Sequence, residues 1–329
     1  MTLVGKYLEY VRSVKRYSSR TVDIYESVLN GYFTCTLGPG DWKDDDVVSA
    51  LNISELRSYQ VHLMDDMKMV PKTVNLHMSV LSGFCRYLLK ENHLNSNPVG
   101  MVPRPQSEKR IPDFYRKDAM EEYYRTSEYY SSQETLEAFI QSPDSPTGKD
   151  FYENRLSRLI VSTLYSLGIR RSELVGMRIE NVDFGRKVVK IRGKGDKMRE
   201  IPLVDSLSEE ILLYLKAVEV LCGGKRSLKD PLFVTYKGGP LYPVYVDRAV
   251  KKELGSVKNI AGRRSPHVLR HSLATELLDE GADLNSIKEL LGHSSLAATQ
   301  VYTHSSIARL KTIYEQAHPR AKNGGKHGD

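Results

Sequence analysis

Apolar residues recur every three to four positions along the chain up to about residue 98. This spacing places them on one face of an α-helix. The faces of three expected helices are formed by Val22, Tyr25, Val28, Leu29 and Phe33, by Leu56, Tyr59 and Leu63, and by Val74, Met78, Leu81, Cys85 and Leu88. Ser18 or Ser19 is expected to cap the first helix and Ser54 the second. Since no alternating strand pattern intervenes, the region is predicted to be a small all-α domain.

Prolines mark the end of this helical region. Pro98, Pro103 and Pro105 lie close together, in a stretch that also carries Lys109 and Arg110. Proline fixes its own backbone and disfavours the helical conformation of the residue before it. We therefore expect a basic, non-helical linker and a boundary near residue 105, which divides the chain into domains 1–105 and 106–329.

The second domain changes its apolar period once. Val188, Val189 and Ile191, and then Ile201 and Leu203, fit two strands joined by the glycine-containing turn GKGDK. This predicts a β-hairpin with Lys194 at its tip, and hence a fold that is mainly α with a small β-hairpin or sheet (α+β).

Helical spacing flanks this hairpin on both sides. One helix is expected to stop at Gly168, and the helices that follow Ser265 at Gly281 and Gly292. The pattern assigns no role to the polar, tyrosine-rich stretch around residues 123–150.

Charge and cysteine content narrow the function classes. The net charge is +7 and the isoelectric point about 9.0, which fits a polyanionic partner such as nucleic acid, or simply a basic enzyme. Cys35, Cys85 and Cys222 are too few and too far apart for a disulfide framework or a zinc knuckle. No apolar run approaches the roughly 18 residues that span a bilayer, and the N-terminus lacks the apolar core of a secretory signal. We expect a cytoplasmic protein without a membrane segment.

The stretch SPHVLRHSLATELL places chemistry at the start of a helix. Pro266 suits the first helical position, and His267 and Arg270, three residues apart, share a face. A helix N-terminus already carries partial positive charge and free N–H groups, so added cationic groups there indicate a bound anion. The alternative is that His267 is a structural donor and Arg270 pairs with a carboxylate.

Three further signals are each ambiguous alone. Arg170 follows Gly168 at a bend, where it is either a projecting guanidinium or half of a solvated pair with Arg171. Lys194 is either functional or an idle exposed lysine. His293 follows Gly292, and Tyr302 lies further along, where a buried tyrosine is ordinarily part of the core.

Arg170, Lys194, His267 with Arg270, His293 and Tyr302 follow one another in an order that is typical of a known protein family. The segments GIRRSELVGM, GKGDKMREIPL and SPHVLRHSLATELLDEGADLNSIKELLGHSSLAATQVYTH resemble the tyrosine recombinase (phage integrase-like) family, and most of all its Xer branch. The N-terminal segments SSRTVDIYESVLNGYF and KTVNLHMSVLSGFCRYL are similar to the core-binding domain of that family. The resemblance covers essentially the whole chain.

The resemblance implies a site-specific DNA recombinase. Tyr302 would attack a phosphodiester, form a 3′-phosphotyrosyl bond and release a 5′-hydroxyl. Arg170 and Arg270 would contact the non-bridging phosphate oxygens, each with a planar fork of donors.

The remaining family positions would assist this step. Lys194 would protonate the leaving oxygen, His267 would help to deprotonate Tyr302 or bind a phosphate oxygen, and His293 would donate a hydrogen bond to a non-bridging oxygen. No metal, ATP or other cofactor is implied.

The implied partner is a double-stranded DNA recombination site. The family acts as a tetramer on synapsed DNA and exchanges strands through a Holliday junction, either by self-association or with a paralogous recombinase. The two domains would clamp the duplex, with Arg20 and Lys72 as candidate contacts at helix starts, and the C-terminal segment IARLKTIYEQAH would dock on a neighbouring protomer. Such a protein would be associated with the nucleoid.

Several alternatives remain open on sequence alone. The protein would serve chromosome dimer resolution, or integration, excision or inversion of a mobile or phase-variable element; the length of the 123–150 stretch counts against a housekeeping resolvase. It could also be a catalytically silent DNA-binding protein, a type IB topoisomerase, or a metal-dependent nuclease that uses His267, His271, His293 and His304.

Overall fold

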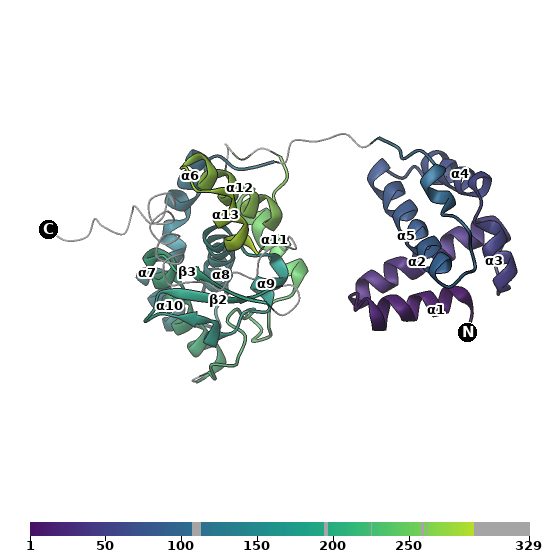
Figure 1. Cartoon of the computed structure of the whole chain (residues 1–329). Coiled ribbons are helices and arrows are strands. Elements are labelled where there is room, and N and C mark those ends of the chain that lie inside the picture. The colour runs from purple at the N-terminus through teal and green to yellow at the C-terminus, as the bar shows by residue number, and fades with distance from the viewer. Residues whose placement is uncertain (107–112, 194–196, 225, 258–259, 261, 293–329) are drawn as a thin grey trace. The chain divides into compact units, whose positions relative to one another are not determined.

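The chain divides into two compact units. The structure, a computed structural model, describes residues 1–106, 113–193, 197–224, 226–257, 260 and 262–292. The first unit comprises Met1–Arg110 and the second Ile111–Asp329 (Figure 1).

Every regular element among the described residues of the first unit is a helix or a helical turn. In chain order its elements are α1 Leu3–Glu9, the π-helical turn η1 Tyr10–Val14, α2 Ser19–Leu37, α3 Asp44–Ala50, α4 Ile53–Val61, the π-helical turn η2 His62–Asp66, α5 Pro71–Lys90 and the 3-10 turn η3 Pro98–Met101. Aromatic rings of α2 and α5 form the centre of its core, where Tyr32, Phe33 and Phe84 are fully buried. The predicted face of α5 is buried along its whole length.

Local details of the first unit both confirm and correct the expectations. Ser18 caps α2 by accepting a hydrogen bond from the N–H of Thr21. The cap of α4 is Asn52 and not Ser54, because the Asn52 side chain accepts from the N–H of Glu55 at 3.0 Å and the helix has begun before residue 54. The proline-rich stretch is wrongly predicted to be non-helical at its start, since Pro98 opens η3, where proline sacrifices no hydrogen bond.

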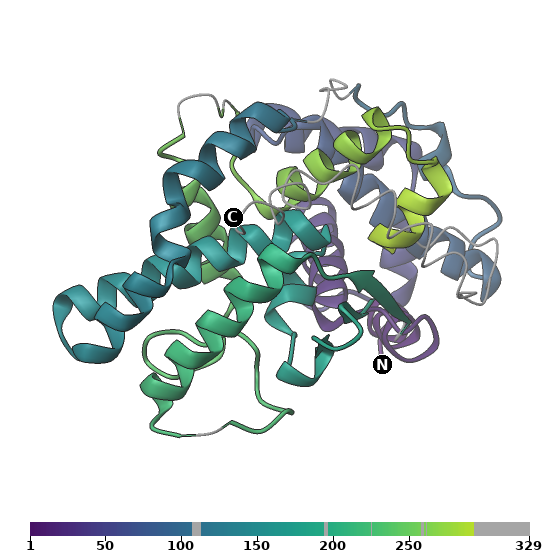
Figure 2. The same ribbon diagram turned by 90° about the vertical axis from the view of Figure 1, so that its left-hand side faces the viewer.

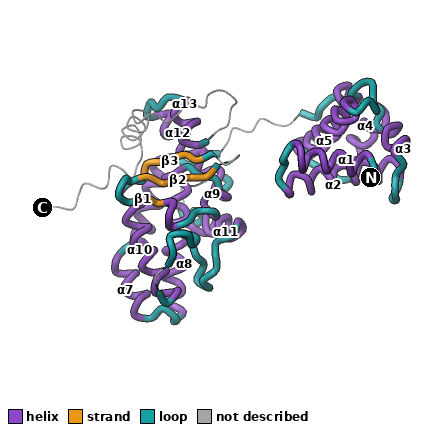
Figure 3. The backbone as a smooth tube through the Cα atoms, turned by 60° about the horizontal axis from the view of Figure 1, so that its bottom comes forward, coloured by secondary structure: helices purple, strands orange, loops and turns teal. Residues whose placement is uncertain are grey.

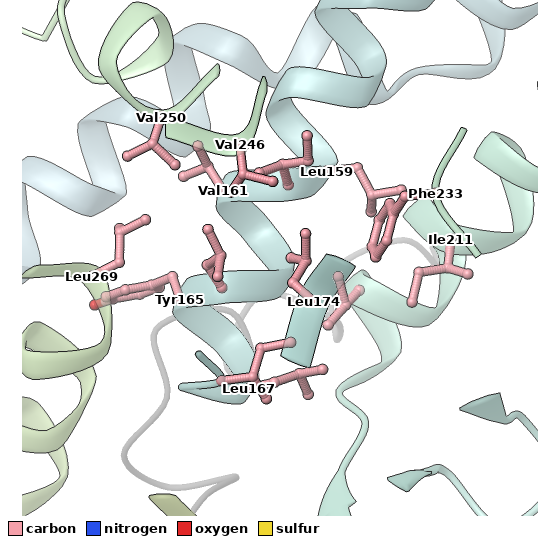
Figure 4. Packing of buried hydrophobic residues seen from close by; sticks show 14 of the residues in the cluster. Leu159, Val161, Tyr165, Leu167, Leu174, Ile211, Phe233, Val246, Val250 and Leu269 are labelled. Carbon is pink, nitrogen blue, oxygen red and sulfur yellow. The ribbon is translucent and has the colours of Figure 1, made fainter. Parts of the chain in front are cut away.

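The second unit is built around one long buried helix. Its elements are α6 Lys117–Ser127, the 3-10 turn η4 Glu128–Ser131, α7 Gln133–Gln141, α8 Pro146–Leu167, α9 Arg171–Val175, the 3-10 turn η5 Ile179–Asn181, β1 Val182–Asp183, β2 Val188–Arg192, β3 Met198–Pro202, α10 Asp205–Cys222, α11 Pro243–Glu253, α12 Pro266–Asp279 and α13 Leu284–Leu291. Every residue of α8 from Arg155 to Leu167 is buried. Figure 4 shows side chains of α8 packed among Leu174, Ile211, Val246, Val250 and Leu269. In Figure 2, α12 and α13 are the yellow-green helices at the end of the described chain.

The strands form one antiparallel sheet in the order β1-β2-β3 (Figure 3). The register of β2 and β3 pairs Val189 with Ile201 and Ile191 with Arg199. The predicted hairpin and the mainly α fold with a small sheet are therefore confirmed. The strand β1 was not predicted, because a two-residue strand has no period to recognise.

The tyrosine-rich stretch has a structural role. It forms α6, η4 and α7, which pack on α8. Two buried arginines of α8 hold it: Arg155 donates to the carbonyl of Ser132 at 2.6 Å, and Arg158 donates to the carbonyl of Tyr124 at 3.2 Å while pairing with Glu210 at 3.1 Å.

Among the described residues, no helix is both long and apolar enough to cross a membrane.

Gly168 is expected to be intolerant of a side chain. It ends α8 with a φ of +57°, and a Cβ atom there would lie 2.7 Å from Leu291 and 2.8 Å from Leu273. We expect Gly168→Ala to lower the free energy of unfolding by about 2–4 kcal/mol, since left-handed strain and overpacking add. Gly223→Ala is the matched control, because Gly223 has a φ of +68° but open space around it, and should cost only about 1–2 kcal/mol. Equal losses in urea unfolding would contradict the packing of α8 against α12 and α13.

Glu276 on α12 should make stability depend on pH. Burial raises the pKa of this carboxyl from 4.5 to about 7, although the hydroxyl of Tyr165 donates to it. Between these two values the folded protein keeps a proton that the unfolded chain releases. Stability should therefore fall by up to about 3 kcal/mol as pH rises through this range. Glu276→Gln should remove this fall in thermal unfolding measured from about pH 5 to about pH 8, whereas Glu219→Gln, at an exposed position, should keep it. The same decline in Glu276→Gln would contradict the assignment.

Candidate active site

The corner between α8 and α9 presents Arg170. After Gly168 ends α8, Ile169 is buried and Arg170 takes the extended conformation that precedes α9. The side chain of Glu173, three residues on, accepts from the backbone N–H of Arg170 at 2.8 Å and from its Nη1 at 2.9 Å. This fixes the guanidinium to its own helix start, while about a third of the Arg170 side chain stays exposed. Arg170 is therefore not half of a freely solvated pair.

Arg270 reaches the same region from α12. Pro266 begins this helix, as predicted, and Arg270 is only 7% exposed. Its Nη1 donates to the carbonyl of Gly168 at 2.8 Å and its Nη2 to the carbonyl of Leu291 at 2.5 Å. Loss of hydration on burial, together with the nearby positive charge of Arg170, lowers the pKa of Arg270 to about 10. The guanidinium therefore remains charged at neutral pH, and these two hydrogen bonds go to carbonyl groups rather than to a carboxylate.

A third arginine, Arg199 of β3, was not singled out from the sequence. Its Nη1 and Nη2 donate to the two oxygens of Glu173 at 3.1 and 2.8 Å, and its Nε donates to the carbonyl of Leu290 at 2.9 Å. Burial raises the pKa of Glu173, but the hydrogen bonds from Arg199 and Arg170 outweigh it and leave the pKa below its ordinary value. Glu173 is thus an ionised carboxylate shared by two arginines.

The three arginines meet at the C-terminal end of α13. Arg199 binds the carbonyl of Leu290 and Arg270 that of Leu291, and Arg170 binds the carbonyl of Gly292 at 2.9 Å. The last carbonyls of a helix lack partners within it and carry partial negative charge. The arginine cluster, defined here as Arg170, Arg199 and Arg270, satisfies these carbonyls.

The arginine cluster retains excess positive charge. Arg170 and Arg199 both pair with the carboxylate of Glu173, so the three guanidinium groups of the cluster share this one negative charge. Because Arg170 is partly exposed, an anion can approach this charge from solvent. Planar guanidinium groups suit a phosphate oxygen pair.

His267 lies one turn before Arg270 but differs from it in exposure. Both residues are in the first turns of α12, and His267 is exposed where Arg270 is buried. The two are therefore neighbours on the helix with different surroundings. The remaining basic candidates, Arg20 and Lys72, are exposed in the first turns of α2 and α5 in the first unit.

Lys194, His293 and Tyr302 lie outside the described residues, as does the C-terminal segment expected to dock on a neighbour. The glycines that precede Lys194 and His293 are described, and both adjoin Arg199. A Cβ atom on Gly193 would lie 3.4 Å from Nη1 of Arg199, and one on Gly292 only 2.9 Å from it. The chain thus leaves the described region toward both candidate residues from beside the arginine cluster.

Comparison with known protein families identifies the family of this chain. Residues 132–309 match the model of that family, and the chain belongs to it. The predicted family is thereby confirmed.

Curated relatives place the chain near the Xer recombinases. The tyrosine recombinase XerC of Chlorobaculum parvum is 31% identical over 323 residues, which cover 96% of this chain and 94% of that protein. The tyrosine recombinase XerD of Staphylococcus aureus is 30% identical over 325 residues, which cover 97% of this chain and 99% of that protein. The resemblance to the Xer branch is confirmed.

Solved structures share the fold. The Tn1549 transposon integrase in complex with transposon right-end DNA gives a TM-score of 0.61 at 19% identity, covering 95% of this chain and 98% of that one. The lambda integrase bound to DNA gives a TM-score of 0.60 at 20% identity, covering 91% of this chain and 95% of that one.

Proposed function

We propose that this protein is a site-specific DNA recombinase that breaks and rejoins DNA through a tyrosyl–phosphate intermediate. The observation that carries the proposal is the convergence of Arg170 and Arg270, which are far apart in the sequence, on neighbouring carbonyls at the end of α13. The described residues thereby form a fixed, partly exposed cationic site, which supports the proposal that a phosphodiester binds there. Membership of the phage integrase family supports the same activity.

The proposed reaction is a balanced transesterification. The phenolic oxygen of Tyr302 attacks the scissile phosphorus, and the bond from phosphorus to the 5′-oxygen breaks. Lys194 gives a proton to that oxygen, while His267 assists proton removal from Tyr302. In the return step a 5′-hydroxyl attacks the phosphotyrosyl bond and releases Tyr302. One phosphate ester is exchanged for another at each step, so religation needs no external energy source.

The arginines supply electrostatic stabilisation. Negative charge grows on the non-bridging oxygens as phosphorus becomes five-coordinate. Guanidinium groups already held by Glu173 and by carbonyls need no rearrangement to meet that charge, which is the condition for effective catalysis by fixed dipoles and charges. His293 would add a hydrogen bond to the same oxygens. We propose no metal or organic cofactor.

The proposed partner is a double-stranded recombination site. Domain 1–105 and domain 106–329 would clamp the duplex, with Arg20 and Lys72 on phosphates, and affinity should fall steeply with salt. Lambda integrase has been solved as a tetramer bound to a Holliday junction, which supports a working tetramer here, formed with copies of this chain or with a paralogue. The protein would act in the cytoplasm, on the nucleoid.

The names of the relatives suggest which biological process this recombinase serves. Relatives named XerC and XerD favour chromosome dimer resolution. Integration, excision or inversion of a mobile element is the alternative within the same chemistry.

A suicide substrate tests the reaction. On a nicked site that loses the leaving strand, the wild-type protein should accumulate a covalent protein–DNA adduct, and Tyr302→Phe should give none. Arg270→Lys should slow adduct formation by about 100- to 1,000-fold, because a point charge replaces a two-armed donor to the transition state. The control is Arg186→Lys, at an exposed ion pair with Glu200, which should react like the wild type.

The outcomes of this test separate the alternatives. No adduct with wild-type protein would indicate a silent DNA-binding protein. Adduct formation with relaxation of plasmids that lack a specific site would indicate a topoisomerase. Cleavage that survives Tyr302→Phe and stops with chelator would indicate a metal-dependent nuclease.

A further inference from the structure

Arg199 is as buried as Arg270, and both arms of its guanidinium bind the carboxylate of Glu173. It is 7% exposed, and each of its three nitrogens donates a hydrogen bond: Nε to Leu290, and Nη1 and Nη2 to Glu173. All three guanidinium nitrogens of Arg199 are bound to protein groups, and two of them hold a carboxylate. Its function must be exerted through its neighbours.

Those neighbours belong to three separate parts of the proposed active site. Through Glu173, Arg199 is joined to Arg170, whose Nη1 donates to the same Oε1 atom that Nη1 of Arg199 contacts. Through the carbonyl of Leu290 it holds the end of α13, and a Cβ on Gly292 would lie 2.9 Å from its Nη1. Through β3 it belongs to the hairpin, where the N–H of Gly193 donates to the carbonyl of Lys197 at 2.8 Å.

We propose that Arg199 is a positioning residue for catalysis, which holds Glu173 and thereby sets the orientation of the Arg170 guanidinium toward the scissile phosphate. The inference rests on the proposed recombinase function. Arg170 donates to Glu173 through one arm and to the Gly292 carbonyl through the other. Arg199 binds the same carboxylate and the carbonyl of Leu290, two residues before Gly292 at the same helix end, so it fixes both acceptors of Arg170 relative to each other.

The substitution Arg199→Lys distinguishes the positioning role of Arg199 from the mere presence of a buried positive charge. The lysine keeps a cation beside Glu173 but cannot bind both carboxylate oxygens and the Leu290 carbonyl in one plane. The Glu173 carboxylate then keeps its hydrogen bonds to Arg170 but loses the clamp that fixes it to β3 and α13, so the two side chains can shift together. A misplacement of about 1 Å at a catalytic group can cost on the order of 100-fold in rate.

The test is a double-mutant cycle on adduct formation with saturating nicked DNA. We expect Arg199→Lys to slow the reaction by about 10- to 100-fold, with unchanged DNA affinity in a mobility-shift assay and a cooperative unfolding transition. Combined with Arg170→Lys, it should slow the reaction no further than Arg170→Lys alone, within about twofold, because both changes disable one unit. Arg186→Lys is the matched control, since Arg186 also binds both oxygens of a carboxylate, Glu200, at 3.1 and 3.0 Å but in an exposed pair.

Each other outcome overturns the inference. A rate for Arg199→Lys within about twofold of wild type would show that the bidentate clamp is dispensable. Effects of Arg199→Lys and Arg170→Lys that multiply would show that Arg199 does not act through Arg170. Loss of the folded state in Arg199→Lys would assign it an architectural role alone. An adduct formed by wild type with a normal Arg199→Lys rate rejects only this inference, whereas no adduct from wild type rejects the proposed function as well.

Discussion

The structure of the second unit depends on hydrogen bonds between the last carbonyls of α13 and three arginines. Leu290, Leu291 and Gly292 each offer a carbonyl that its own helix cannot satisfy, and each receives one guanidinium. These guanidinium groups come from the α8–α9 corner, from β3 and from α12. The end of one short helix is thus the point at which four separate parts of the chain are fixed relative to one another.

This arrangement solves an electrostatic problem. Three guanidinium groups repel one another, and burial of Arg270 adds the cost of lost hydration, as its lowered pKa shows. Neutral carbonyl dipoles and the single carboxylate of Glu173 offset this repulsion without cancelling the charge. The arginine cluster therefore keeps a net positive charge in a fixed arrangement, which is the arrangement that the proposed phosphate contact requires.

The sequence predicted the elements well because their signals are local. Helical spacing identified the buried faces of α2, α4 and α5, and a change of period identified the β2–β3 hairpin. The wrong predictions concern the ends of helices, where a single residue determines the boundary. Asn52 caps α4 in place of Ser54, and Pro98 begins a 3-10 turn in a stretch that was predicted to be non-helical.

The candidate site was only partly predictable because its contacts are distant in sequence. Arg170 and Arg270 stand out at a bend and at a helix start. Arg199 was missed, although the sequence contained a signal for it. Arg199 and Ile201 are two residues apart on β3 and so lie on the same, inward-facing side of the strand, where an arginine requires buried partners. Which partners it has depends on where β3 lies against α9 and α13, and no local pattern contains that information.

The most direct measurement is a crystal structure of the Tyr302→Phe protein on an intact recombination site. We predict that the guanidinium groups of Arg170 and Arg270 will each lie within hydrogen-bonding distance, about 3 Å, of a non-bridging oxygen of one phosphate, while Arg199 keeps both oxygens of Glu173. A scissile phosphate held elsewhere, with the arginine cluster still bound only to protein groups, would contradict the account.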